Sequence, residues 1–203
     1  MSAFDGLHEL LATESAIDPV GDRILAAAAD LVGRRGHQQT TMAEIARKAG
    51  VGRATVFRRF GSKQEIIDRA LVRELRLLAL VLKDSATNAD TAAAALIDCF
   101  VLSMRAMRRR PLLRRLAQVE PEQLIAFARL RRPPVLELWR SMYRSIVESF
   151  DTQVDPLQCC ALADVLIHLT LGYNLVPESS IDLKDDEKLR RLAASVVEPV
   201  LGQ

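Results

Sequence analysis

The segment from residue 40 to residue 63, TTMAEIARKAGVGRATVFRRFGSK, constrains the fold more than any other part of the chain. Thr41 and Glu44 have the spacing of a capping box, which predicts a helix that starts just after Thr41. Gly50 is expected to end this helix, because glycine enters the left-handed backbone conformation without steric cost. A second helix is expected over Arg53–Phe60. The segment therefore predicts a helix-turn-helix.

The second predicted helix has one buried and one exposed face. At 100° per residue, Val56 and Phe60 lie about 40° apart and define the buried side. Arg58 falls opposite them, and the small residues Ala54 and Thr55 flank it. One long cation between small neighbours suits a helix that approaches base edges in the major groove of DNA.

Further basic residues surround this face. Arg53 and Arg59 lie further round the same helix, where the phosphates of a duplex would be. Ser62 is expected to cap a third helix, and Lys63 at its start is placed for a backbone phosphate. The predicted DNA-binding residues are Thr40, Thr41, Arg53, Ala54, Thr55, Phe57, Arg58, Arg59 and Lys63.

In this segment the chain resembles the TetR family of transcriptional regulators. Two residues depart from the family's pattern: Phe57 stands where Tyr is usual, which removes a hydroxyl that could contact a phosphate, and Gly52 stands where Ser is frequent. The remainder of the chain resembles the family only in length and helical character. The residues that fit the pattern are Thr40, Thr41, Ile45, Ala46, Ala49, Gly50, Val51, Thr55, Val56, Phe57, Phe60, Ser62 and Lys63.

The resemblance implies a homodimeric repressor that binds a palindromic DNA operator and releases it when a small molecule occupies the C-terminal domain. It also implies that the helix after Lys63 is the lever between ligand and DNA. A second copy is needed on physical grounds as well, since one recognition helix reads only a few base pairs. The alternative is a helix-turn-helix adaptor that acts through protein partners without a small-molecule effector.

The composition favours helices. Hydrophobic residues make up 49% of the 203 residues and aromatic residues only 4%, and no sustained polar–apolar alternation or Asn-Gly turn signals a strand. We therefore predict an all-α protein, with an N-terminal three-helix helix-turn-helix DNA-binding domain and a C-terminal helical ligand-binding and dimerisation domain.

The net charge of +2 is unevenly distributed. Residues 1–18 contain four acidic residues and no Lys or Arg, whereas residues 19–63 contain nine basic and three acidic residues, a net +6. A positive excess at the helix-turn-helix is typical of nucleic-acid binding, although a solvated basic face gives the same pattern. We predict a flexible acidic arm over 1–18, a DNA-binding domain over 19–64 and a ligand-binding and dimerisation domain over 65–203.

Apolar residues at helical spacing predict the remaining helices. Residues 156–176 are apolar on almost every side, which indicates burial at an interface; Asp164, His168 and the lack of other spans argue against a membrane. We expect a homodimer through helices near 156–176 and 183–201. The other expected helices cover 19–35, 63 to about 82 before a polar break at 85–90, 92–110, 112–117, 121 to an interruption at Arg132–Pro134, and 135–150.

A ligand cavity is expected between the middle helices. Aromatic and Met residues are ordinary core material, but the polar tips of Trp139 and Tyr143 can hydrogen-bond a ligand. His168 is either a polar anchor or, with Asp164 one turn earlier, a structural pair. The predicted ligand-binding residues are Phe100, Met104, Phe127, Trp139, Tyr143 and His168.

Between Arg105 and Arg144 there are eleven Arg residues and three Glu residues. This excess is either a solvated surface, whose side-chain stems cover apolar neighbours, or a site for an anionic effector such as an acyl-coenzyme A thioester. The expected effector is therefore apolar or an anionic acyl thioester.

No cofactor, metal site or enzymatic activity is predicted, because the cysteines and histidines lack ligand spacing and no nucleophile–base signature is present. The acidic N-terminus has no long apolar core, so we expect no signal peptide and a cytoplasmic protein. The cysteines and histidines of the chain are Cys99, Cys159, Cys160, His8, His37 and His168.

Overall fold

The computed structural model describes residues 18–130, 135–150 and 153–202, which form ten α-helices and no strand, and this confirms the all-α prediction. Residues 1–17 of the acidic arm expected over 1–18, and the interruption expected at Arg132–Pro134, lie outside the described residues. The helices are α2 (Pro19–Arg35), α3 (Met42–Ala49), α4 (Arg53–Phe60), α5 (Lys63–Thr87), α6 (Ala92–Arg109), α7 (Pro111–Gln118), α8 (Pro121–Leu130), α9 (Val135–Glu148), α10 (Pro156–Leu175) and α11 (Asp186–Leu201).

Helices α3 and α4 form the predicted helix-turn-helix. Thr41 caps α3: its Oγ1 accepts from the N–H of Glu44 at 3.2 Å, and the Glu44 carboxylate accepts from the N–H of Thr41 at 3.0 Å. Gly50 ends α3 in the left-handed region, with φ of 67°. Ser62 caps α5 by accepting from the N–H of Glu65. These local signals set the helix boundaries as the sequence predicts.

Two helix ends differ from the predictions. α5 continues into the polar stretch at 85–90 and ends at Thr87, because Ala86 is buried and holds this last turn against the core. α11 begins at Asp186 rather than at residue 183, because the Asp185 carboxylate caps it by accepting from the N–H groups of the next turn.

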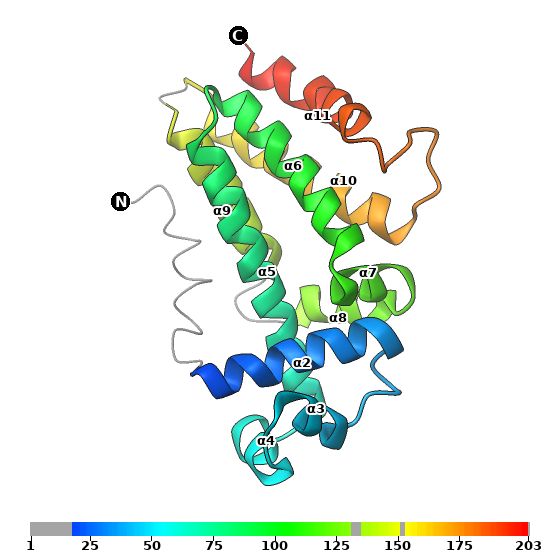
Figure 1. Cartoon of the computed structure of the whole chain (residues 1–203). Coiled ribbons are helices and arrows are strands. Elements are labelled where there is room, and N and C mark those ends of the chain that lie inside the picture. The colour runs from blue at the N-terminus through cyan, green and yellow to red at the C-terminus, as the bar shows by residue number, and fades with distance from the viewer. Residues whose placement is uncertain (1–17, 131–134, 151–152, 203) are drawn as a thin grey trace.

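The core consists of two clusters that meet along α5. One cluster joins α2, α3, α4 and the first half of α5 with α7 and α8, and the other joins the second half of α5 with α6, α9, α10 and α11. Figure 1 shows α2 lying across the lower part of α5, with α3 and α4 beyond it and α11 at the opposite end. α5 therefore links the helix-turn-helix to the C-terminal helices.

α10 is more apolar than the other helices and is only partly covered. By length and composition it is the single candidate membrane span among the described residues. An 18-residue stretch of this helix has a mean hydropathy of 1.2, and 28% of that stretch is buried. One side packs in the core through Leu162 and Leu166, whereas Leu157, Val165 and the following Val176 are 78%, 42% and 62% exposed. An apolar surface of this kind is available to a further partner.

Candidate nucleic-acid interface and ligand cavity

α4 has an anchored side and an open side. Val56 and Phe60 hold it in the core, with exposed fractions of 0% and 8%. Arg53 and Arg58 lie on the exposed side, and neither forms a hydrogen bond or an ion pair with another residue in the described ranges. Both guanidinium groups are therefore available to an anionic partner.

The neighbours of these arginines are small or apolar. Ala54 is exposed, Thr55 is half-buried, and Phe57 is 65% exposed. A large aromatic ring beside two cations is an unusual surface for a soluble helix, because such a ring is normally buried. Arg53, Ala54, Phe57 and Arg58 thus form one continuous open face.

Thr40 does not join this face, which corrects its predicted role. It is 1% exposed, and its hydroxyl donates to the carbonyl of Gly36 at 2.8 Å. Thr41 is exposed, but its Oγ1 lies 2.8 Å from the Glu44 carboxylate as part of the capping box. Thr40 therefore shapes the loop before α3, and only Thr41 is accessible.

Arg59 is held inside the protein's own ion pairs. Its guanidinium donates to both carboxylate oxygens of Asp18, at 3.0 and 2.8 Å. Asp18 also accepts from the N–H of Gly21, and that bond, together with Arg59, lowers the pKa of its carboxyl group. Arg59 thus ties the end of α4 to the start of α2, in competition with the phosphate contact predicted for it.

Lys63 is likewise engaged. Its Nζ donates to the carbonyl of His37 at 2.9 Å, while the N–H of His37 donates to both carboxylate oxygens of Glu120, at 3.2 and 3.1 Å. Partial burial, and next the nearby Lys63 charge, lower the pKa of the His37 imidazole. Residue 37 is therefore held from one side by α5 and from the other by the loop between α7 and α8. We call this arrangement the His37 clamp.

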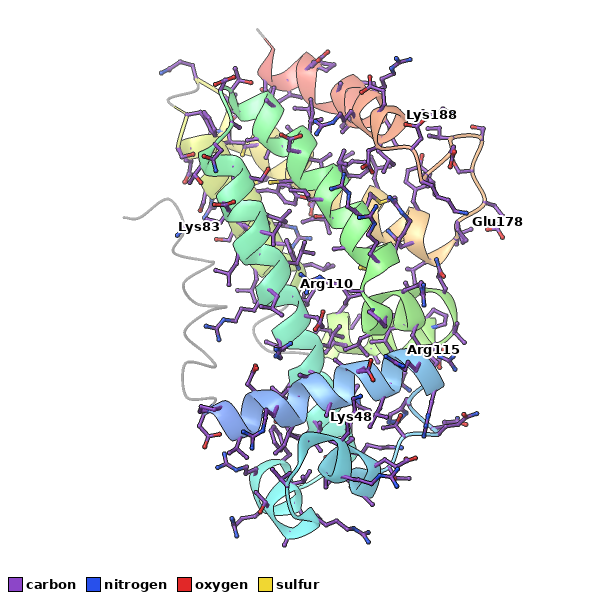
Figure 2. The ribbon with its side chains drawn as sticks, in the orientation of Figure 1. Lys48, Lys83, Arg110, Arg115, Glu178 and Lys188 are labelled. Atoms are coloured by element: carbon purple, nitrogen blue, oxygen red, sulfur yellow. The ribbon has the colours of Figure 1, made fainter. Side chains whose placement is uncertain are left out.

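α2 rests directly on α7. A Cβ atom added at Gly33 would lie 2.6 Å from Cβ of Pro111 and 2.8 Å from the N of Leu112, distances that only glycine avoids. Figure 2 shows Arg115 of α7 above the C-terminal end of α2, where it pairs with Glu120 at 3.4 Å. A shift of α7 must therefore move α2 or the loop that follows it.

A second link between the two ends of the molecule is ionic. Asp22 of α2 pairs with Arg73 of α5 at 2.6 Å, and this contact lowers the pKa of the Asp22 carboxyl group. Glu74 lies 3.5 Å from Arg73 and 2.9 Å from Arg110, which stands at the junction of α6 and α7 (Figure 2). These four residues connect α2, α5 and α7.

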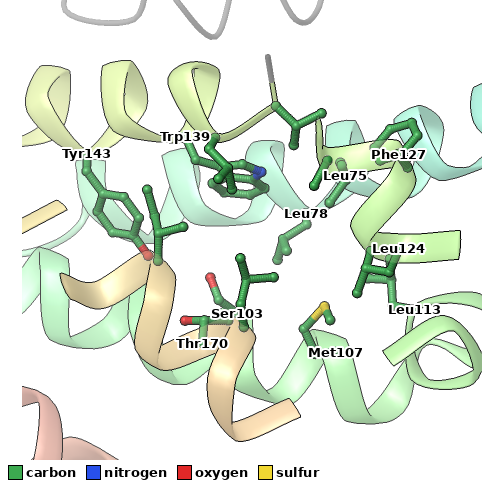
Figure 3. A pocket seen from close by; sticks show the side chains of 15 residues that line it. Leu75, Leu78, Ser103, Met107, Leu113, Leu124, Phe127, Trp139, Tyr143 and Thr170 are labelled. Carbon is green, nitrogen blue, oxygen red and sulfur yellow. The ribbon is translucent and has the colours of Figure 1, made fainter. Parts of the chain in front are cut away.

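A cavity of about 80 Å³ lies between α5 and α10, and Figure 3 shows the side chains around it. None of the lining side chains in the described parts of the chain is charged. Three carry hydroxyl groups, Trp139 carries an indole N–H, and the others are apolar. The lining residues are Leu75, Leu78, Ser103, Met107, Leu113, Leu124, Phe127, Ala128, Val135, Leu136, Trp139, Tyr143, Ile167, Thr170 and Leu171.

The hydroxyl groups occur together at one side of the cavity. Tyr143 and Ser103 are buried, and burial raises the pKa of the Tyr143 phenol above its ordinary value. Thr170 donates to the carbonyl of Leu166 at 2.8 Å. In Figure 3 these hydroxyls lie away from the side formed by Leu124 and its apolar neighbours.

The structure brings together only part of the predicted ligand site. Phe127, Trp139 and Tyr143 line the cavity. Phe100 and Met104 do not line it; both are 0% exposed and are core side chains of α6. The prediction for these two residues is therefore corrected, because helical periodicity identifies a buried face without showing which part of it borders a void.

His168 lies away from the cavity, on the outer side of α10. It is exposed, its Nδ1 is 2.7 Å from the carbonyl oxygen of Asp164, and it borders a shallow groove with Val165 and Val176. The Asp164 carboxylate pairs with Arg140 of α9 instead of with His168. His168 therefore does not line the cavity, and its ring is bonded to the backbone of Asp164 rather than to the Asp164 carboxylate.

The arginines that the structure describes between 105 and 144 do not line the cavity. Those with acidic partners are distributed over several surfaces. The pairs are Arg105 and Arg108 with Asp186, Arg110 with Glu74, Arg115 with Glu120, Arg140 with Glu137 and Asp164, and Arg144 with Glu148.

Most of the aliphatic wall and Ser103 were not predicted from the sequence. Ser103 interrupts the apolar side of α6 between Phe100 and Met107 and is 5% exposed. A buried hydroxyl on an apolar helix face was the one signal that could have indicated it, because such a group needs a partner. No group of three or more His, Cys, Asp or Glu residues in the described parts of the chain could hold a metal ion.

Comparisons with known proteins agree with this architecture. Residues 24–70 match the model of the bacterial regulatory proteins of the tetR family. The chain is 45% identical over 53 residues to the uncharacterised HTH-type transcriptional regulator YvkB of Bacillus subtilis, a match that covers 26% of this chain and 28% of YvkB. It is 41% identical over 70 residues to the HTH-type regulator Mb2274c of Mycobacterium bovis, which covers 34% of this chain and 35% of that protein. The similarity to both relatives thus covers little more than a third of their length at most.

Solved structures extend the likeness to the C-terminal helices. The TetR-family repressor AlkX from Dietzia sp., implicated in biodegradation of n-alkanes, has a TM-score of 0.65 and 19% identity and covers 92% of this chain and 98% of its own. FadR from Bacillus subtilis in complex with stearoyl-CoA has a TM-score of 0.58 and 15% identity, with 88% and 96% covered. At these identities the likeness concerns the fold alone. Residues 24–70 are thus similar to the DNA-binding part of the tetR-family regulators, and the whole chain has the fold of solved TetR-family repressors.

Proposed function

We propose that this protein is a homodimeric repressor that binds a palindromic operator through α3 and α4 and leaves it when a small molecule occupies the cavity. The observation that carries the DNA-binding part is the open face of α4, where the Arg53 and Arg58 guanidiniums have no partner among the described residues. Unpartnered cations on an exposed helix suit a polyanion, because their binding releases counterions from DNA.

The residues of this face differ in what they can read. Arg58, opposite the buried anchors, suits a bidentate contact with the major-groove edge of guanine. Phe57, 65% exposed, suits contact with a thymine methyl group, a role that needs no hydroxyl. Arg53 at the first turn suits a phosphate. Lys63 and Arg59 act mainly by holding the helix-turn-helix in place.

The dimer is assigned to the exposed apolar side of α10, with α11 beside it. Leu157, Val165 and Val176 are exposed along α10, and burying them in a second copy removes apolar surface from water. Two helix-turn-helix units must lie about 34 Å apart to enter successive major grooves. Val165→Asp is expected to convert the dimer to a monomer in light scattering; a dimer that persists places the interface elsewhere.

The small size of the cavity accounts for how a bound ligand would release DNA. A cavity of about 80 Å³ is smaller than most effectors, so a ligand must displace α7, α8 or α9 to enter. α7 bears on α2 at Gly33, and the loop after α7 holds His37 through Glu120. The ligand-bound state would therefore have a different spacing of the two α4 helices, and the ligand shifts the population towards it.

The effector class follows from the lining. Of the two expected classes, the apolar one fits better, because none of the described residues that line the cavity is a cation that could neutralise an anionic thioester. The adaptor alternative needs no cavity at all, so the void between α5 and α10 favours an effector. Operator binding also places the protein in the cytoplasm.

The test is an electrophoretic mobility shift with the DNA flanking the protein's own gene. Specific retardation that is lost with Arg53→Ala/Arg58→Ala supports DNA binding through α4. Retardation that no compound reverses, although compounds bind in the cavity, would support the adaptor. Absence of any specific complex would overturn the proposal.

A further inference from the structure

A second hollow lies outside the cavity, at the junction of α2 and α7. It is an open cleft of about 510 Å³ beside the contact of Gly33 with Pro111. No residue is shared between its lining and that of the cavity between α5 and α10. Arg34 of α2 and both Arg114 and Arg115 of α7 line it, and none of the described lining residues is acidic. The cleft is therefore a separate, basic site.

The two outer arginines of the cleft are incompletely neutralised. Arg34 shares the carboxylate of Asp30 with Lys48, and both cations lie 2.9 Å from it. Arg114 is exposed, and its side chain forms no hydrogen bond or ion pair with another residue in the described ranges. Both helices that form the cleft therefore present positive charge that their neighbours do not balance.

Arg115, between α2 and the end of α7, also lacks a full set of acceptors. Its Nη2 donates to the Glu120 carboxylate over a long distance of 3.4 Å, and its Nε is buried without an acceptor in the described parts of the chain. Glu120 in turn accepts from the N–H of His37. About a quarter of the Arg115 side chain, 27%, is exposed (Figure 2). An anion in the cleft would give this guanidinium a second partner.

We propose that the cleft binds a small phosphoryl anion, of the pyrophosphate or phosphate-ester class, which bridges Arg34 of α2 with Arg114 and Arg115 of α7. Planar guanidinium groups match phosphate oxygens with paired hydrogen bonds, and oxygens on several sides of the ligand let it meet both helices. Such a ligand would tie α2 to α7. The inference goes beyond the proposed function, because anion binding at this cleft requires neither an operator nor an effector in the cavity.

The direct test is isothermal titration calorimetry of the full chain with sodium pyrophosphate. The titration is carried out at pH 7.5, without magnesium and at constant ionic strength, so that general screening does not change. We expect one saturable site per chain. Inorganic phosphate should bind about threefold to tenfold more weakly, because it carries less charge and fewer oxygens.

Variants locate the anion. Arg114→Gln and, separately, Arg34→Gln are expected to weaken pyrophosphate binding about tenfold, since each removes a charged donor from one helix of the cleft. Arg144→Gln is the matched control, because it removes a half-exposed arginine of α9 that does not line the cleft. Arg53→Gln/Arg58→Gln removes the unpartnered cations of α4 and should also leave the affinity unchanged. Thermal unfolding of each variant confirms that it is folded.

The outcomes separate the cleft from the proposed function. Absence of saturable pyrophosphate binding, or equal affinities in the wild type and both cleft variants, would overturn the proposal. Binding that is lost in Arg53→Gln/Arg58→Gln but kept in Arg34→Gln and Arg114→Gln would also overturn it, by assigning the anion to α4. If the cleft variants alone lose pyrophosphate and the protein binds no operator, the cleft site stands and the proposed function fails.

Discussion

The open face of α4 and the cavity between α5 and α10 are binding surfaces of opposite character. The first lies on one eight-residue helix and exposes two guanidinium groups. The second is built from side chains of six helices, and none of the described residues that line it is charged. A surface on a single helix keeps its shape when neighbouring helices move, whereas a cavity shared by six helices changes with each of them. The difference indicates that the cavity can respond to a ligand, whereas the face of α4 can only be moved as a unit.

Contact between these regions runs through α2, α7 and the His37 clamp. Glu120 lies between α7 and α8, both of which line the cavity, and its carboxylate accepts from the loop that precedes α3. α5 links the same regions through a continuous helix. Variants in α4 test the DNA-facing surface, and variants at Gly33 and Glu120 test its contact with the cavity. A variant at Asp18 tests the edge of the DNA-facing surface.

The largest effect is expected for Arg58→Ala. Loss of a guanidinium that reads a base should lower operator affinity about tenfold to hundredfold and relax specificity at that position. Fluorescence anisotropy with labelled operator at fixed salt measures the change. Arg144→Ala removes an exposed arginine of α9 and serves as the control. Unchanged sequence preference in Arg58→Ala would assign base reading to another residue.

The second-largest effect is expected for Gly33→Ala, which tests the packing of α2 on α7. The added methyl group would lie within 3 Å of Pro111 and Leu112, so α2 must move away from α7. Overpacking of this kind lowers the free energy of unfolding by about 1–3 kcal/mol. Urea unfolding followed by circular dichroism measures it. A variant as stable as the wild type would mean that α2 and α7 separate easily.

A smaller effect is expected for Glu120→Gln, which weakens the His37 clamp but keeps a side chain of the same size at position 120. The ratio of operator affinities without and with effector should fall by about twofold to thirtyfold, the range of single-residue coupling changes. Glu122→Gln is the matched control, because Glu122 is an exposed residue of the adjacent α8. An unchanged ratio in Glu120→Gln would leave α5 and the packing of α2 on α7 as the connections.

The smallest effect is expected for Asp18→Asn, which changes a charge next to the open face. Asn retains the cap of α2, but the bidentate ion pair with Arg59 is lost. Arg59 then becomes available to a phosphate, so operator affinity should rise about twofold to threefold. The anisotropy assay used for Arg58→Ala detects this. A fall in affinity would show that the Asp18–Arg59 pair holds α4 in its binding orientation.

The helix-turn-helix could be predicted from sequence because its determinants are local. Thr41 and Glu44 close their capping box within four residues, and Gly50 needs only its own φ of 67°. The roles of Thr40 and Lys63 could not be predicted in this way. They depend on the loop at 36–37, which Glu120 fixes from more than eighty residues away in the sequence.

The cavity was predicted only in part because it is non-local. Trp139 and Tyr143 were identified by their polar tips, and Phe127 by its size. Phe100 and Met104 have the same pattern but face a filled part of the core. A void is the difference between side-chain volumes on six helices, and no single helix contains that information.

The unpartnered charges of Arg53 and Arg58 also determine how the protein responds to ionic strength. In the free protein they add to a region of residues 19–63 with a net charge of +6, and the mutual repulsion within that region weakens as salt rises. On DNA the same charges attract, and that attraction also weakens as salt rises. Added salt should therefore stabilise the free N-terminal helices while it loosens their hold on the operator, so the conditions in which the fold is most robust are those in which it binds least.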